Sequence, residues 1–204
     1  MALGAGQYGL ECHRNLRRRE GQVPAHSFRI RYNLATVLLC VRMTGETLVP
    51  DSISNPIRTG FHPDPSICRV GEDYYLVTSS FTWFPGLPIY HSRDLANWSL
   101  IGHALTNPKA IDFSGMTDND GIWAPTLRYH NGTFYLITTA HGCGGNFYMT
   151  AKNPAGPWSD PVWLKDAPGI DPSLFFDEDG RCYYTGNRWD FKSAWPAQCA
   201  VWMQ

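Results

Sequence analysis

The sequence DPSI at residues 64–67 recurs in altered form as APTL at 124–127 and as DPSL at 171–174, and this repeat decides the fold. Each copy is followed by a run rich in apolar residues, namely YYLVTS at 74–79, FYLITT at 134–139 and CYYT at 182–185. A short polar turn separates the two runs of each copy, as in antiparallel strands joined by a hairpin. We therefore expect three similar units built from strands, with almost no helix.

The spacing of these copies predicts a β-propeller. Their first residues, Asp64, Ala124 and Asp171, lie 60 and then 47 residues apart. Repeats of roughly 40–50 residues made of strands are typical of propeller blades. A β-sandwich is the alternative, but it does not explain why every unit opens with the same Asp/Ala-Pro-Ser/Thr sequence. We call the first residue of this sequence, at positions 64, 124 and 171, the corner of its unit. We expect about three blades here, fewer than the four to eight or so of a closed propeller.

The composition excludes several classes of protein. The chain has 204 residues, of which 43% are hydrophobic and 17% are charged, and its net charge is −1. These values exclude a disordered chain, a coiled coil and a strongly basic nucleic-acid binder. The six cysteines form no CxxC pair and have no regular spacing with histidine, so we expect no structural zinc site. Disulfide pairing stays open.

The first 50 residues differ from the rest. They hold seven Arg, three Glu and no Trp, whereas residues 51–204 are acidic and hold all eight Trp. We expect 1–50 to be a basic leader, either poorly ordered or signal-like, and 51–204 to be the N-terminal part of a propeller domain. The apolar run at 34–41 follows basic residues as in a signal peptide, but it is too short to span a bilayer.

Asp64 and Asp171 are the candidate catalytic residues. The first strand of each propeller blade lies beside the central channel, so the corners of successive blades converge at one mouth. Two carboxylates beside aromatic rings suit sugar chemistry, because acids transfer protons and flat rings stack on sugar faces. The alternative is that an Asp before Pro only starts a turn. Ala124 argues against this, since a turn that needed Asp would need it there too.

Six stretches together make the acidic part resemble glycoside hydrolase family 43, in particular its β-xylosidases and α-L-arabinofuranosidases. They are NPIRTGFHPDPS at 55–66, SFTWFPG at 80–86, HSRDLANW at 91–98, GIWAP at 121–125, GPWSDP at 156–161 and GIDPSLFFDEDG at 169–180. The resemblance runs from about residue 55 to the last residue. It implies an all-β, five-bladed β-propeller and hydrolysis with inversion at the anomeric carbon.

The resemblance also implies roles for individual residues. Asp64 would be the general base that activates water, and Asp171 would tune the pKa of the general acid and orient it. The residues expected around the terminal sugar are Phe81, Trp123 and Ala124 in the pocket and Trp83 near its rim.

For some aromatic and polar residues a structural role competes with a functional one. We favour core packing for Trp98 and Trp158, and a pocket position over a core position for Phe81 and Trp123. His62 either supports the Asp64 corner through a hydrogen bond or caps a turn.

The general acid of the family is a Glu in a Glu-Gly-Pro segment, and this sequence has no such segment. Glu178 lies in an acidic hairpin turn and is a poor substitute. We therefore expect the chain as given to be nearly inactive, as the front part of an enzyme, because a general acid contributes about 10²–10⁴-fold to the rate. No cofactor or metal is expected to be required. A structural calcium ion in the complete protein would take its protein ligand from outside these residues.

Three functions stay open. The first is an exo-glycosidase acting on terminal β-xylosyl or α-L-arabinofuranosyl residues of plant cell-wall polysaccharide, with xylo-oligosaccharides or arabinose-substituted chains as partners. The second is a propeller remnant that binds carbohydrate without catalysis, and the third is a propeller that binds other proteins. We expect no nucleic-acid or membrane partner. A polymeric substrate favours an extracellular location, with the cytoplasm as the alternative. Ile170, where xylosidase relatives often have an aromatic residue, leaves the preferred sugar open.

Overall fold

The computed structural model describes residues 52–189 and 199–203, so the predicted leader at 1–50 lies outside the described residues. The described residues belong to one compact unit, Glu46–Gln204. They form eleven strands and no helix. Among them there is accordingly no helix that could cross a membrane.

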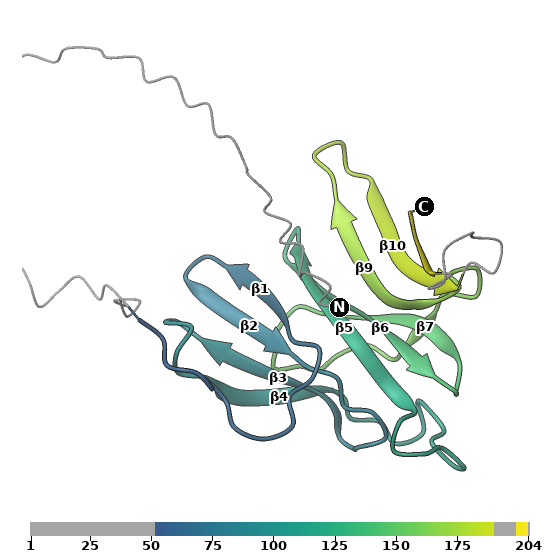
Figure 1. The fold of residues 1–204 in the computed structure, drawn as a ribbon. Coiled ribbons are helices and arrows are strands. Elements are labelled where there is room, and N and C mark those ends of the chain that lie inside the picture. Colours follow the sequence, from purple (N-terminus) through teal and green to yellow (C-terminus); the bar gives the residue numbers. More distant parts are fainter. Residues whose placement is uncertain (1–51, 190–198, 204) are drawn as a thin grey trace, which may run out of the picture. The chain divides into compact units, whose positions relative to one another are not determined.

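The strands form three antiparallel sheets, each with its strands in chain order (Figure 1). The first sheet holds β1 (Ser66–Val70), β2 (Asp73–Val77), β3 (Gly86–Ser92) and β4 (Ser99–Leu105). The second holds β5 (Gly121–His130), β6 (Thr133–His141), β7 (Gly145–Ala151) and β8 (Val162–Trp163). The third holds β9 (Ile170–Phe176), β10 (Cys182–Trp189) and β11 (Cys199–Met203).

The predicted hairpins are confirmed in all three sheets. The strands β1 and β2, β5 and β6, and β9 and β10 pair in antiparallel register around the polar turns of the repeat. In the second sheet the turn consists of Asn131 and Gly132, whose φ angles are 47° and 74°. Asn and Gly adopt such positive angles more readily than other residues, which explains why an Asn-Gly pair closes this hairpin.

The first strands of the three sheets lie side by side, with β5 between β1 and β9. The backbone N–H of Leu127 on β5 donates to Ser66 Oγ on β1 over 3.1 Å. On the other side Arg128 Nε donates to the carbonyl of Leu174 on β9 over 3.0 Å. Four-stranded meanders whose first strands adjoin are the blades of a propeller. The predicted all-β propeller class is thus confirmed, with three blades in the described part of the chain.

The core lies within and between the first two sheets. Its fully buried side chains include Leu87, Ile89, Leu127, Leu136 and Phe147. Trp158 is partly buried against this cluster. Trp98 is partly buried too, and its indole N–H donates to the carbonyl of Leu95 over 2.9 Å. The structure therefore agrees with core packing for Trp158, whereas the indole of Trp98 is hydrogen-bonded within the segment after β3.

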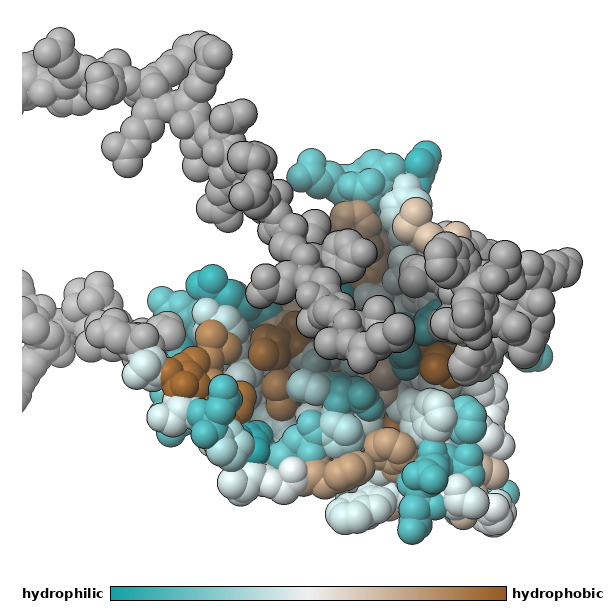
Figure 2. Space-filling view, viewed as in Figure 1, coloured by the Kyte–Doolittle hydropathy of each residue, from teal (hydrophilic) through white to brown (hydrophobic). Residues whose placement is uncertain are grey.

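Equivalent residues on the inner strands differ in how far they are covered. Leu127 of β5 is fully buried because β1 and β9 flank it, whereas Ile67, at the same position of β1, is 49% exposed. Figure 2 shows brown, hydrophobic residues among hydrophilic ones on the visible face. Within the described residues, one side of the first blade thus has no neighbouring blade.

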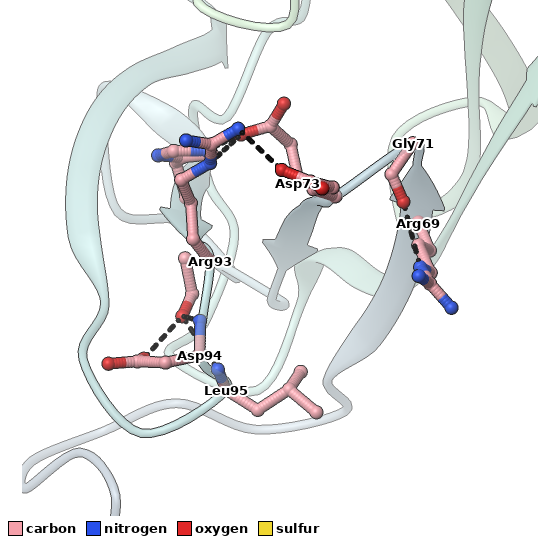
Figure 3. A network of polar contacts seen from close by, with 9 residues as sticks. Arg69, Gly71, Asp73, Arg93, Asp94 and Leu95 are labelled. Atoms are coloured by element: carbon pink, nitrogen blue, oxygen red, sulfur yellow. Dashed lines mark hydrogen bonds and ion pairs between the residues drawn. The ribbon is translucent and has the colours of Figure 1, made fainter. Parts of the chain in front are cut away.

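A polar network stabilises the end of the first sheet at which β1 ends and β2 begins (Figure 3). Asp73 Oδ1 contacts Nε2 of His91 at 2.8 Å and Nε of Arg93 at 3.2 Å. The hydrogen bond with His91, and then the charge of Arg93, lower the pKa of Asp73 below its ordinary value. Arg93 is followed by Asp94, which accepts hydrogen bonds from the backbone of Ala96 and Asn97 in the turn after β3.

Candidate active site

Asp64, Ala124 and Asp171 occupy equivalent positions of the repeat. Asp64 lies two residues before β1, Ala124 is the fourth residue of β5 and Asp171 is the second residue of β9. The residue two positions after each corner pairs with the second strand of the same hairpin. The pairs are Ser66 with Val77, Thr126 with Ile137 and Ser173 with Thr185. The φ angles of the three corner residues are 52°, 36° and 55°. All three corners therefore share one left-handed backbone conformation, and each precedes a proline.

This conformation does not by itself explain the aspartates. A left-handed φ costs a residue other than Gly about 1–3 kcal/mol, and Asp and Asn tolerate it better than Ala. Ala124 nevertheless adopts it in the second sheet. The surrounding structure thus enforces the corner without a carboxylate, so the two carboxylates call for another reason.

The carboxylate of Asp64 is held by a serine that lies two residues beyond β2 of its own blade. Ser79, which is buried, donates from Oγ to Asp64 Oδ2 over 2.6 Å. The same Oγ accepts a hydrogen bond of 2.7 Å from the backbone N–H of Ala124. A hydroxyl that donates to an ionised carboxylate forms a short, strong bond. One serine side chain therefore links the first corner to the second, and Asp64 remains solvent-exposed.

Asp171 lies at the corresponding corner of the third sheet and is also solvent-exposed. Partial burial of its carboxyl group raises its pKa above the ordinary value, and the nearby charge of Asp64 raises it further. The structure thus places the two aspartates within electrostatic reach of each other at one end of the inner strands. Displaced pKa values of this origin are common at functional sites.

Aromatic rings adjoin the corners in an unbroken series. The ring of Phe61 lies 5.6 Å from that of Phe81 and 6.0 Å from that of Trp83, measured between centroids. Phe81 in turn lies 6.4 Å from Trp123. Trp83 is 67% exposed, whereas Phe81 and Trp123 are partly buried. The structure therefore brings together the aromatic residues that were predicted to surround the sugar.

Phe81 is held by its backbone. It pairs with Ile122 in an isolated bridge, with N–H to carbonyl bonds of 3.0 Å in both directions. This close approach requires glycine at the neighbouring position, because a Cβ on Gly121 would lie 2.3 Å from the Phe81 carbonyl oxygen. Gly121 also has a φ of 93°, which side-chain-bearing residues rarely adopt.

His141 is a site residue that sequence reasoning missed. Its ring stacks on Trp123 with centroids 3.8 Å apart and planes 5° apart. Nδ1 of His141 lies 3.0 Å from Asp120 Oδ1, and Trp123 donates from Nε1 to the carbonyl of Asn119 over 2.9 Å. One face of the indole is therefore covered by protein, so a ligand can stack only on what His141 leaves open.

His62 does not hydrogen-bond the Asp64 side chain. Its Nε2 lies 3.2 Å from the carbonyl of Thr59, and its ring meets Tyr90 edge-on at 5.6 Å. Of the two predicted roles, the structure therefore supports the cap of a turn. Glu178 lies in the β9–β10 hairpin turn, at the other end of β9 from Asp171.

A second polar cluster lies between the second and third sheets. Thr139 donates from Oγ1 to Asn146 Oδ1 over 2.6 Å. The amide nitrogen of Asn146 lies 2.7 Å from the carbonyl of Ala167, 3.1 Å from that of Gly169 and 2.9 Å from Tyr184 Oη. Asn146 is buried, and burial raises the pKa of Tyr184 to about 12. The cluster thus fixes the segment that leads into Asp171.

A cavity of about 720 Å³ also opens between these two sheets. Its lining includes Tyr135, Tyr148, Trp163 and Phe176, and none of the three corner residues. The rings of Tyr135 and Phe176 pack on each other with centroids 4.8 Å apart. The cavity is therefore separate from the aspartate site.

The residues that the structure describes include no group of three or more His, Cys, Asp and Glu side chains placed to hold a metal ion. Cys68, Cys143 and Cys182 are free thiols. What the corners offer is two exposed carboxylates with different electrostatic surroundings, next to aromatic rings. Such a pair can transfer protons to and from a bound sugar and water.

Antiparallel blades whose first strands adjoin define the β-propeller class, and two of the three corners carry an exposed carboxylate. The model of the family "Glycosyl hydrolases family 43" matches residues 53–204, and the chain belongs to this family. The family predicted from the sequence is thereby confirmed.

Named relatives agree with this assignment. A non-reducing end α-L-arabinofuranosidase of Bacteroides ovatus is 54% identical over 155 residues, which cover 74% of this chain and 29% of that protein. A xylosidase/arabinosidase of Butyrivibrio fibrisolvens is 58% identical over 66% of this chain and 26% of its own length. The solved xylan β-1,4-xylosidase of Bacillus halodurans superimposes with a TM-score of 0.69 at 48% identity, over 75% of this chain and 30% of that one. The chain thus spans less than a third of these relatives.

Proposed function

We propose that this chain carries part of the active site of an inverting exo-glycosidase that releases terminal β-xylosyl or α-L-arabinofuranosyl residues. The observation that carries the proposal is the pair Asp64 and Asp171. These exposed carboxylates stand at equivalent corners of the first and third blades, and the charge of one raises the pKa of the other. The names of the relatives, which include both xylosidases and arabinofuranosidases, support both sugars as candidates.

In this mechanism Asp64 is the general base. The hydrogen bond from Ser79 to Oδ2 fixes the orientation of this carboxyl group. Its other oxygen takes a proton from the water that attacks the anomeric carbon. Inversion requires the acid and the base to lie about 6.5–9.5 Å apart, so that the water fits between the base and the sugar.

Asp171 has a different task. Its carboxyl group has a raised pKa and lies within reach of the Asp64 charge. A carboxylate in this place raises the pKa of a neighbouring acid and orients it, as the resemblance implies for this residue. Phe81, Trp123 and Ala124 would enclose the terminal sugar, with Trp83 at the rim.

The proton donor comes from outside these residues. The sequence has no Glu-Gly-Pro segment, and Glu178 lies in a hairpin turn remote from the corners. We therefore expect the 204-residue chain alone to be nearly inactive, because loss of the general acid costs about 10²–10⁴-fold. The reaction needs no resident cofactor. The described residues include no group of three or more His, Cys, Asp and Glu side chains that could hold a metal ion, and no step in this proposal passes through one. A polymeric substrate favours action outside the cell.

A non-catalytic carbohydrate-binding propeller is the second candidate. The aromatic series Phe61, Phe81 and Trp123 lies within this chain, whereas the acid does not. Rings of this kind bind sugar faces whether or not hydrolysis follows. In that case Asp64 and Asp171 would contribute only hydrogen bonds.

The test uses a chimera in which residues 53–204 replace the matching segment of the B. ovatus arabinofuranosidase. We expect the chimera to hydrolyse aryl α-L-arabinofuranosides, and Asp64→Asn to lower kcat at least about 100-fold while sugar binding persists. Asp179→Asn, in the β9–β10 turn, is the matched control and should have no effect. Undiminished hydrolysis by the Asp64→Asn chimera would falsify the assignment of the base. Sugar binding by a wild-type chimera that does not hydrolyse would favour the binding module.

A further inference from the structure

Ser79 and Thr139 occupy the same position in the first and second blades. Ser79 lies two residues beyond the end of β2 and Thr139 lies within β6, and each is opposite the residue that precedes a corner. The N–H of Ser79 donates to the carbonyl of Pro63, before Asp64, over 3.0 Å. Thr139 pairs with Trp123, before Ala124. Both side chains are buried hydroxyls, with exposures of 3% and 2%.

We propose that the hydroxyl groups of Ser79 and Thr139 position the two catalytic carboxylates. Ser79 fixes Asp64 relative to the second blade, and Thr139, through Asn146, fixes the backbone before Asp171 relative to the same blade. The proposal rests on the function proposed above. Neither residue touches the reacting atoms, so both are positioning residues.

In the first blade the connection is direct. Ser79 Oγ uses its proton for Asp64 Oδ2, at 2.6 Å, and its lone pair for the N–H of Ala124, at 2.7 Å. A hydroxyl can make both bonds at once only when its rotamer is fixed. The side chain of Asp64 is therefore tied to the backbone of the neighbouring corner, so the two corners cannot shift independently.

In the second blade the hydroxyl of Thr139 acts through a further residue, Asn146. Thr139 donates to Asn146 Oδ1, which directs the amide N–H groups of Asn146 away from Thr139 and toward the third blade. There they meet the carbonyls of Ala167 and Gly169, the latter two residues before Asp171. Tyr184 of β10 contacts the same nitrogen at 2.9 Å. The start of β9 is thus anchored to the second blade at a buried point.

Both catalytic carboxylates are therefore held in place relative to the same part of the protein, the second blade. Ala124 supplies no functional side chain, yet its backbone N–H anchors Asp64. Catalytic geometry is sensitive to small displacements, and a shift of 1 Å can cost about 100-fold in rate. A lost hydroxyl at position 79 or 139 should therefore reduce turnover more than substrate binding.

The first test measures the network in the 204-residue chain. In Ser79→Ala the backbone N–H of Ala124 loses its acceptor, so its hydrogen exchange, followed by NMR, should accelerate about tenfold or more. Ser79→Thr retains the hydroxyl and should restore protection. In Thr139→Val the side-chain amide protons of Asn146 should shift and exchange faster, and Thr139→Ser should restore them. Ser92→Ala is the matched control, because Ser92 is equally buried and accepts from the backbone of Leu95 but lies far from the corners.

The second test measures catalysis in the chimera. Ser79→Ala and Thr139→Val should each lower kcat by about 10–100-fold with little change in KM, and Ser79→Thr and Thr139→Ser should recover most of it. Unchanged exchange at Ala124 in Ser79→Ala, or a kcat loss in Ser92→Ala as large as in Ser79→Ala, overturns the proposal. A wild-type chimera without activity refutes the proposed function instead, and the exchange measurement still decides whether the network exists.

Discussion

The charge of Asp64 reaches the carboxyl group of Asp171 across the inner ends of the first and third sheets and adds to the rise in its pKa. These two residues belong to different blades, and they lie within electrostatic reach of each other because β1, β5 and β9 adjoin. The two aspartates thus interact through their charges, whereas Ser79 and Asn146 hold them in place through hydrogen bonds.

Asp64→Asn should lower the pKa of Asp171. The substitution removes a nearby negative charge but leaves partial burial, so the pKa should fall toward its ordinary value without reaching it. A carbon-detected NMR titration of the side-chain carboxyl groups in the 204-residue chain measures this. Asp179→Asn, at the far end of the third sheet, should leave the titration of Asp171 unchanged. An Asp171 titration that is the same with and without the Asp64 charge would show that the pair does not interact.

Asp171→Asn should stabilise the chain at neutral pH. The folded state raises the pKa of this carboxyl group, so between the ordinary and the raised values the folded state binds more protons than the unfolded state. Ionised Asp171 therefore destabilises the fold at every pH above its raised pKa, and this cost vanishes as the pH falls below the ordinary Asp value. Thermal unfolding at neutral pH and at low pH measures the difference.

Asp73→Asn is the contrasting substitution and should destabilise the chain at neutral pH. His91 and Arg93 lower the pKa of Asp73, so its stabilisation is present above the ordinary Asp value and is lost as the pH falls through the lowered value. A decrease in the unfolding temperature upon Asp171→Asn at neutral pH, or an increase upon Asp73→Asn, would contradict the assigned environments.

Trp123 and Trp158 should respond differently to truncation. Trp158 packs against the core, so Trp158→Ala should lower the free energy of unfolding by about 2–4 kcal/mol. Trp123→Ala should cost less stability but, in the chimera, should lower kcat/KM for an arabinofuranoside about tenfold or more, because a stacking ring is lost. Chemical denaturation and steady-state kinetics separate the two effects. Equal stability losses with unaltered kinetics would place Trp123 in the core instead.

Gly121 and Gly71 form a matched pair for the backbone contact that holds Phe81. Both have a positive φ, but a Cβ at Gly71 meets nothing within 4 Å, whereas one at Gly121 would meet the Phe81 carbonyl at 2.3 Å. Gly71→Ala should therefore cost only the left-handed penalty, about 1–2 kcal/mol. Gly121→Ala should cost more than about 3 kcal/mol, since the backbone must move. Similar losses in urea unfolding for both variants would show that the bridge to Ile122 is not rigid.

Much of the fold could be predicted from the sequence because the repeat contains residues that determine the local backbone conformation. The Asn131-Gly132 pair and the recurring Pro corners mark hairpins and inner strands without reference to the rest of the chain. The alignment of Asp64, Ala124 and Asp171 then placed the corners together. Hairpins, propeller class and family are all confirmed.

The supporting residues could not be predicted in this way. Ser79 and Thr139 are ordinary strand residues in the sequence, and their roles depend on hydrogen bonds to other blades. His141 stacks on Trp123 because β5 and β6 pair there, and nothing in its neighbouring sequence marks it as a site residue. His62 had two open roles, which only the position of Thr59 could separate. The assigned roles of Asp64, Asp171, Phe81, Trp83, Trp123 and Ala124 stay predictions.

The most direct test of the central claim, that Asp64 is the base of an inverting glycosidase, is the configuration of the first-formed sugar. Proton NMR during hydrolysis of an aryl α-L-arabinofuranoside by the chimera shows which anomer appears before mutarotation. We predict the inverted β-anomer with wild-type Asp64, and its formation should fall at least about 100-fold in Asp64→Asn. Initial release of the retained α-anomer, or inverted product at an undiminished rate without the Asp64 carboxylate, would contradict the account.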